Sequence, residues 1–147
     1  VYKRQGMGRV GSGAYDHLKS VCGDTLIGID FDRDIIEQQI RSGRRVLQED
    51  ATDPDFYNRI DRTNSAVELI LVTLPNHASN VAVVRQLQLH NYPGHIAATA
   101  KYADEVADFN ELGVESAYNI YAEAGSGFAG HILNQIKCDD RTDKHRK

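Results

Sequence analysis

Short apolar runs alternate along the chain with segments in which apolar residues recur every three or four positions. The first pattern is typical of strands covered on both faces, and the second of helices with one buried face. The strongest strand is predicted at Val67–Leu74, which is almost continuously apolar and is followed by Pro75. Further strands are predicted at residues 25–30, 45–48, 95–100 and 116–121, and helices at residues 10–21, 34–42, 54–60, 77–89, 103–112 and 125–136.

The order strand, helix, strand, helix with short connections predicts a parallel sheet with helices on both faces. With the segment before Gly6 counted as a first strand, the sheet has six mostly parallel strands. This number matches the two halves of a Rossmann-like, doubly wound dinucleotide-binding fold. The 147 residues suffice for one domain with a sizeable core. The charged segment 137–147 is expected to form a frayed tail.

Composition and charge narrow the function classes. The net charge of −4 disfavours nucleic acid as a partner, because phosphate backbones bind basic surfaces. The longest clean apolar run, Leu69–Val72, is far too short to span a membrane. Cys22 and Cys138 lie far apart, and the six histidines are scattered, so neither a disulfide framework nor a metal site is predicted. These features fit a cytosolic setting.

A glycine string, Gly6-Met7-Gly8-Arg9-Val10-Gly11, precedes the first predicted helix and has the form G-x-G-x-x-G. In a strand-to-helix turn, the first glycine permits the tight turn, the second lets the backbone approach a phosphate, and the third lets the helix pack closely. The N-terminus of the helix then offers unpaired N–H groups to that phosphate. The string therefore predicts a nucleotide-phosphate site.

An acid, Asp30, ends the next strand 19 residues after Gly11. This spacing is close to that of the carboxylate that binds ribose hydroxyls in dinucleotide-binding folds. The same carboxylate would repel a 2′-phosphate, so NAD or an adenosine nucleotide is favoured over NADP. Arg33 is interpreted as an exposed residue at the start of a helix.

Two further segments end strands at the same predicted edge. Thr73-Leu74-Pro75-Asn76 follows a central strand, where open α/β sheets bind ligands, and Asp50-Ala51-Thr52 is placed to border an adenine. Both admit a second interpretation, because Asp50 and Asn76 are also good capping residues.

Several motifs together carry a family resemblance: GMGRVGSGAYDHL, IGIDFD, EDATD, LILVTLPN and ELGVESAYNIYAEAGSGFAGHI. Over residues 6–136 the chain resembles the regulatory nucleotide-binding domain of potassium transport systems, the RCK or KTN (TrkA N-terminal) domain. The most similar members are the cytoplasmic domains of Kef-type potassium/proton antiporters. The resemblance implies a Rossmann-like fold, binding of NAD(H) or of AMP- or ATP-type nucleotides without a metal, a homodimer, and gating of a membrane-embedded potassium transporter from the cytoplasmic face.

The resemblance also implies which residues bind the nucleotide. The phosphate loop falls on Gly6, Gly8, Arg9 and Gly11, the ribose acid on Asp30, the adenine-side acid on Asp50, and a basic residue near a phosphate on Lys101. Glu49 departs from the glycine usual before this Asp-Ala pair and could narrow the adenine pocket. The candidate binding set is Gly6, Met7, Gly8, Arg9, Val10, Gly11, Asp30, Phe31, Asp32, Asp50, Ala51, Thr73, Leu74, Pro75 and Lys101.

Two function classes compete for this sequence. A regulatory module would bind nucleotide and bias a transporter, either fused to it or as a free-standing subunit. The alternative is the cofactor-binding fragment of an NAD-dependent dehydrogenase, which needs a substrate domain with an acid/base residue near the nicotinamide. The sequence offers no nameable catalytic set after the last predicted strand, so we expect the regulatory, non-enzymatic module.

The five residues Val1–Gln5 stand where this fold has a central strand, but Lys3, Arg4 and Gln5 are too polar for burial on both faces. Their stems could extend to solvent. Alternatively, VYKRQ is the translation of a transposon-end sequencing adapter, GTG TAT AAG AGA CAG. We favour the second interpretation, in which residues 1–5 are not native and the domain proper begins at Gly6.

This interpretation makes a prediction about the gene. Independent sequencing across the locus should show codons for an apolar strand directly before Gly6, and a membrane domain upstream of it. Independent sequencing reads in which the upstream gene sequence continues through the codons for VYKRQ would contradict the adapter origin.

Overall fold

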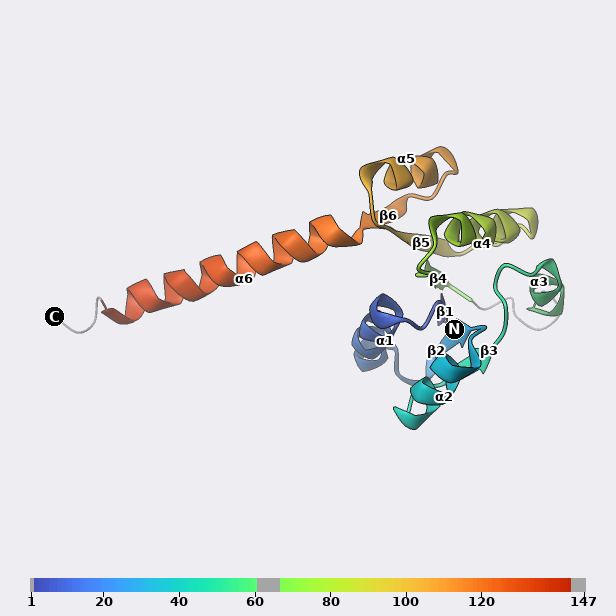
Figure 1. The fold of residues 1–147 in the computed structure, drawn as a ribbon, viewed down its shortest axis with the longest axis horizontal. Coiled ribbons are helices and arrows are strands. Elements are labelled where there is room, and N and C mark those ends of the chain that lie inside the picture. The colour runs from blue at the N-terminus through green and yellow to red at the C-terminus, as the bar shows by residue number, and fades with distance from the viewer. Residues whose placement is uncertain (1, 61–66, 144–147) are drawn as a thin grey trace.

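The computed structural model describes residues 2–60 and 67–143 of the chain. It contains a six-stranded sheet in the order β3-β2-β1-β4-β5-β6, in which every pairing is parallel (Figure 1). The strands are β1 (Tyr2–Gln5), β2 (Leu26–Asp30), β3 (Val46–Gln48), β4 (Leu69–Val72), β5 (His95–Ala100) and β6 (Ser116–Asn119). The prediction of a Rossmann-like α/β fold is confirmed, and the residues directly before Gly6 occupy a central strand.

The helices that connect these strands lie close to their predicted positions, and a further helix follows β6. They are α1 (Arg9–Cys22), α2 (Arg33–Arg41), α3 (Pro54–Ile60), α4 (His77–Leu89), α5 (Ala103–Glu111) and α6 (Ile120–Asp143), with a short 3-10 turn at Gly23–Thr25. Figure 1 shows α1 and α2 on one side of the sheet and α4 and α5 on the other. This arrangement follows from right-handed crossovers that run in opposite directions from the central pair β1 and β4.

Polar side chains begin several of these helices. The carboxylate of Asp32 accepts hydrogen bonds from the backbone N–H groups of Asp34 and Ile35, and the side chain of Asn76 accepts one from Ser79. Asn119 does the same for α6, accepting from Tyr121 at 3.1 Å and Ala122 at 3.0 Å. These bonds satisfy amides that have no partner inside the helix and so fix where each helix starts.

The core consists of two clusters, one for each face of the sheet. The larger one combines β4 and β5 with α4 and α5 and includes Val72, Val83, Val84 and Phe109, all fully buried. The smaller one, Met7, Tyr15 and Leu26, lies against α1, with Leu18, Ile35 and Val46 packed around it. The smaller cluster therefore holds α1 and the glycine string against the start of the sheet.

The last helix differs from its prediction. It begins at Ile120 rather than near residue 125 and continues to Asp143, so the expectation of a frayed tail from Lys137 is wrong as far as Asp143. Asn119 caps the earlier start, and no proline interrupts the segment that follows. Figure 1 shows α6 extending away from the sheet. None of the helices in the two described ranges is both long and apolar enough to cross a bilayer.

The position of β1 between β2 and β4 locates the region of interest. From the central pair β1 and β4 the connections run in opposite directions along the sheet. This pair is therefore the topological switch point of the fold. In open α/β sheets the crevice outside the carboxyl ends of the strands at such a point binds ligands. Asp30 is the last residue of β2, and the glycine string and Thr73 directly follow β1 and β4.

Candidate functional site

Two adjoining clefts open at the carboxyl edge of the sheet. The first has a volume of about 400 Å³ and the second of about 370 Å³, and they share Asp30, Phe31, Leu74 and Pro75 in their walls. The first is also lined by Gly8, Arg9, Val10, Asp32, Ile35, Thr73, His77, Asn80, Thr99, Ala100, Lys101, Glu105 and Ile120. The second is also lined by Ile29, Glu49, Asp50, Ala51, Thr52, Asn76 and Ser79.

The structure gathers most of the sequence-predicted residues around these clefts. From the predicted set, the first cleft takes Gly8, Arg9, Val10, Asp32, Thr73 and Lys101, the second takes Asp50 and Ala51, and the shared wall takes Asp30, Phe31, Leu74 and Pro75. Gly6, Met7 and Gly11 line neither cleft. They belong to the inner side of the loop and determine its shape.

The first and third glycines of the string allow close backbone contacts. Gly6 has a φ of 90°, and a Cβ there would lie 2.6 Å from the Thr73 carbonyl oxygen. A Cβ on Gly11 would lie 1.9 Å from the Gly6 carbonyl oxygen. At Gly8 a Cβ would meet nothing within 4 Å, so the second glycine faces open space beside the cleft. The loop therefore has a tightly packed inner side and an open outer side.

The peptide group between Gly6 and Met7 is hydrogen-bonded at both ends. Its N–H, on Met7, donates to Oδ2 of Asp30 at 2.9 Å, and its carbonyl, on Gly6, accepts from the Thr73 hydroxyl at 2.7 Å. The N–H of Gly6 donates in turn to the Ile29 carbonyl at 2.8 Å. The loop is thus attached to β2 and to the end of β4, the two neighbours of β1.

Asp30 is the acid predicted to bind a ribose, and its carboxylate already has partners in the protein. Oδ2 accepts from Met7, Oδ1 accepts from the N–H of Asp32 at 3.0 Å, and the residue is only 6% exposed. A carboxylate oxygen has two acceptor sites, so each can accept a further hydrogen bond from the cleft. Asp30 therefore shapes the loop and at the same time presents a carboxylate to the shared wall of both clefts.

The N-terminus of α1 faces the first cleft with no acid in its first turn. Gly8 is the N-cap, and the next residues are Arg9 and Val10, which both line the cleft. The amides at a helix N-terminus and the aligned peptide dipoles favour an anion there. Arg9 and Lys101 both line this cleft and add positive charge to it.

The second cleft has a more acidic wall. Oδ1 of Asp50 accepts hydrogen bonds from the backbone N–H and the hydroxyl of Thr52, so Asp50 does act as a turn cap. Asp50 also lines the second cleft. Glu49 pairs with Arg59 of α3 at 2.6 Å. The Glu49 carboxylate is thereby attached to α3 at the border of the cleft. The exposed ring of Phe31 stands in the wall shared with the first cleft.

Sequence reasoning missed the far end of the first cleft, where α4, α5 and α6 contribute. Asn80 is buried and forms hydrogen bonds of 2.9 Å to both the N–H and the carbonyl of Leu74. Nε2 of His77 lies 2.9 Å from Oδ2 of Asp108, and its Nδ1 is buried with no hydrogen-bond partner among the described residues. The only sequence signal for either residue was their position in the first turns of the helix after the Thr73–Asn76 segment.

The family model of the TrkA-N domain matches residues 5–120, which contain every element from the glycine string to β6. The chain belongs to the TrkA-N domain family. The resemblance read from the motifs is thereby confirmed. No curated protein matches the chain significantly.

Solved structures similar to this TrkA-N domain share its fold at low sequence identity. The NAD(P)-binding domain of an exopolyphosphatase-related protein from Archaeoglobus fulgidus has a TM-score of 0.79 at 20% identity, covering 90% of this chain and 97% of that one. The TrkA-N domain of the inner membrane protein YbaL from Escherichia coli has a TM-score of 0.72 at 22% identity, covering 88% and 93%. The Kef CTD of Shewanella denitrificans in its AMP-bound form has a TM-score of 0.74 at 18% identity, covering 92% and 80%.

The glycine contacts generate a matched pair of variants. Gly11→Ala places a methyl group against the Gly6 carbonyl and should destabilise the domain by roughly 1–3 kcal/mol, the usual cost of overpacking. Gly13→Ala, two residues later in α1, meets open space and should stabilise it by about 0.5–1 kcal/mol. Denaturant unfolding of both variants measures the difference. Equal unfolding midpoints for the two variants would show that the Gly6 carbonyl does not pack tightly against position 11 of α1.

Proposed function

We propose that this TrkA-N domain is a regulatory module that binds an adenine nucleotide, NAD(H) or an AMP- or ATP-type ligand, and thereby gates a potassium transporter. The observation that carries the proposal is the loop from Gly6 to Gly11, fixed at its inner side by Asp30 and Thr73 and open at its outer side beside the first cleft. A loop held in this way offers its amides to a phosphate without a reorganisation cost on binding.

The proposed pose follows from the charges of the two clefts. The phosphate lies against Gly8–Gly11 and the N-terminus of α1, between Arg9 and Lys101. The ribose hydroxyls donate to Asp30, and the adenine enters the second cleft beside Phe31 and Asp50. The carboxylate of Asp30 would repel a 2′-phosphate, which favours NAD(H) over NADP(H).

The proposal of a transporter partner rests on the family and on its solved relatives. The similar structures include a domain of an inner membrane protein and a Kef CTD with AMP bound. By analogy we assign this domain to the cytoplasmic face of a potassium transporter, as a fused domain or as a separate subunit. Regulation then requires that bound and free forms, or two different nucleotides, favour different transporter states, because tight binding alone shifts no equilibrium.

A dehydrogenase fragment is the alternative function. His77 lies in the first cleft, where a nicotinamide half would extend, and histidine is a common proton donor or acceptor in such enzymes. Its Nε2 is already paired with Asp108, however, which places the imidazole against α5. We therefore propose a non-catalytic role, in which the cleft binds nucleotide without transferring hydride.

We further propose that the domain forms a homodimer through α6. Every described side chain from Tyr121 to Lys137 is exposed, including Phe128 (70%) and Ile136 (53%). Phe128, Ile132 and Ile136 are spaced four residues apart and so form one row along the helix. An isolated helix gains little stability in water and exposed apolar rows mark interaction surfaces, so a second copy of α6 is the occupant that fits this row.

The ribose contact is tested by Asp30→Ala. Loss of the carboxylate should weaken binding of AMP and NAD by roughly 1–3 kcal/mol, or about 5- to 150-fold in Kd, measured by isothermal titration calorimetry. Because Asp30 also holds the loop, the melting temperature should fall as well. Asp55→Ala removes an exposed acid in the first turn of α3, outside both clefts, and serves as the control. Undiminished affinity in Asp30→Ala would refute the pose.

The dimer is tested by placing a charge in the α6 row. Ile132→Asp should convert a dimer into a monomer in light scattering coupled to size-exclusion chromatography, because the interface would have to desolvate a carboxylate. Asn134→Asp adds the same charge on the opposite side of the helix and should leave the dimer intact. A wild-type monomer, or a dimer that persists in Ile132→Asp, would remove α6 as the interface.

A further inference from the structure

A polar network behind the glycine loop connects it to α1, to α2 and to the segment after α2. The carbonyl of Met7 accepts two hydrogen bonds, one from the Ser12 hydroxyl and one from Nε2 of Gln39, both at 3.0 Å. Nε2 of Gln39 also lies 3.0 Å from the Ser12 hydroxyl oxygen. Gln39 is only 5% exposed, so its amide depends on these partners for its hydrogen bonds.

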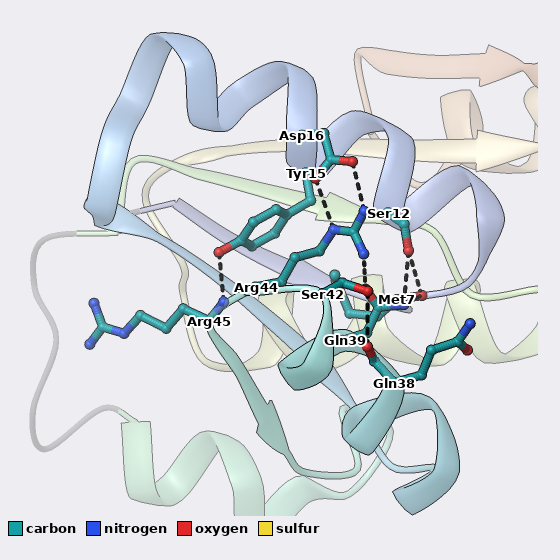
Figure 2. Close-up of polar contacts among 9 residues, drawn as sticks. All are labelled: Met7, Ser12, Tyr15, Asp16, Gln38, Gln39, Ser42, Arg44 and Arg45. Carbon is teal, nitrogen blue, oxygen red and sulfur yellow. Dashed lines mark hydrogen bonds and ion pairs between the residues drawn. The ribbon is translucent and has the colours of Figure 1, made fainter.

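The orientation of the Gln39 amide is fixed from the other side by Arg44. A guanidinium nitrogen of Arg44 donates to Oε1 of Gln39 at 2.8 Å, and two further nitrogens donate to the carboxylate of Asp16 at 2.8 and 2.7 Å (Figure 2). An arginine side chain has only donors, so the oxygen of the Gln39 amide must face it. The NH₂ group of Gln39 is then left to face the Met7 carbonyl.

Asp16 in turn fixes the guanidinium of Arg44. Its hydrogen bond raises the pKa of Arg44 above its ordinary value, against the opposing effect of burial. The two parallel bonds define the plane of the guanidinium as well as its position. Arg44 follows the C-terminus of α2, which would attract any cation. The fixed orientation of its guanidinium is more specific than that attraction requires.

The bonds to the Met7 carbonyl have a consequence for the cleft. In a trans peptide the C=O and the N–H point in opposite directions. A Met7 carbonyl held against Gln39 and Ser12 therefore directs the N–H of Gly8 away from the network. Gly8 lines the first cleft, on the open side of the loop.

We propose that Gln39 is a positioning residue for the phosphate-binding loop, and that the Arg44–Asp16 pair sets the direction in which Gln39 donates. This inference rests on the proposed nucleotide binding. It assigns to three residues outside both clefts an effect on ligands that carry a phosphate at the loop. Loss of Arg44 frees the Gln39 amide to turn and frees the Met7–Gly8 peptide to rotate.

Binding of AMP compared with adenosine tests the proposal. Arg44→Met and Gln39→Met should each raise the Kd for AMP by roughly 2- to 10-fold, the range for one neutral hydrogen bond, and leave the Kd for adenosine unchanged. Asp16→Asn, at an exposed position, should fold normally and give a smaller change of the same kind. Arg33→Met removes an exposed ion pair with Glu37 on the same helix and should change neither affinity.

Two results would overturn the proposal. One is an AMP affinity in Gln39→Met and Arg44→Met equal to that of the wild type, and the other is an equal loss for AMP and adenosine, which a general structural defect would produce. Amide hydrogen exchange gives a readout without ligand: exchange in residues 7–12 should accelerate in Arg44→Met relative to the core of β4 and β5. If the wild type binds no nucleotide, the proposed function fails. Separately, exchange rates in residues 7–12 that are the same in all variants as in the wild type would refute the positioning role.

Discussion

The shape of the carboxyl edge depends on two successive peptide groups, Gly6–Met7 and Met7–Gly8. The first is held at both ends, by Asp30 of β2 and by Thr73 after β4. The second is held at its carbonyl by Gln39 and Ser12. An unpaired buried carbonyl or amide costs about 1–3 kcal/mol, so these contacts limit the loop to very few conformations. The position of α1, the course of the loop and the opening of the first cleft all follow from them.

Asp30 has two roles that both depend on its carboxylate: it holds the loop, and it lines both clefts. Its buried carboxylate accepts hydrogen bonds from the backbone of Met7 and Asp32, and the same residue stands in the wall of both clefts. A nucleotide that donates hydroxyl groups to this carboxylate would add partners to a charge that is already desolvated. A nucleotide with an extra phosphate next to this carboxylate would be repelled by its negative charge. Loop stability and the proposed ligand selectivity would therefore have one physical origin.

α6 stands in contrast to the rest of the domain. Every other helix contributes side chains to the two core clusters or to the clefts, whereas the described side chains of α6 after Ile120 are exposed. Ile120 itself lies in the first cleft and begins the helix. A ligand bound in the first cleft would thus lie beside the first residue of the helix that carries the exposed row Phe128, Ile132 and Ile136. This proximity would give a physical basis for coupling the proposed nucleotide binding to the proposed dimer.

Much of the fold was predictable because local pattern and tertiary packing agree in it. Strand β5 has the predicted bounds, and Asn76 and Gly11 have their predicted local roles, since each depends on neighbours within a few residues. Strand β4 is shorter than its apolar run, because pairing ends before Thr73, whose hydroxyl bonds to the loop. The extent of α6 was underestimated because its exposed helix shows no core-facing periodicity that continues past Ile136.

For the site, the sequence by itself determined which residues lie at or just after the strand ends: the glycine string, Asp30, Asp50 and Thr73–Pro75. Their clustering follows from parallel topology, in which the carboxyl ends of the strands meet at one edge. Only the tertiary structure decided that Asp30 binds backbone amides, that His77 and Asn80 join the first cleft, and that Arg44 orients Gln39. These are contacts between residues distant in sequence, and their geometry depends on how helices from both halves pack against the sheet, which no local pattern encodes.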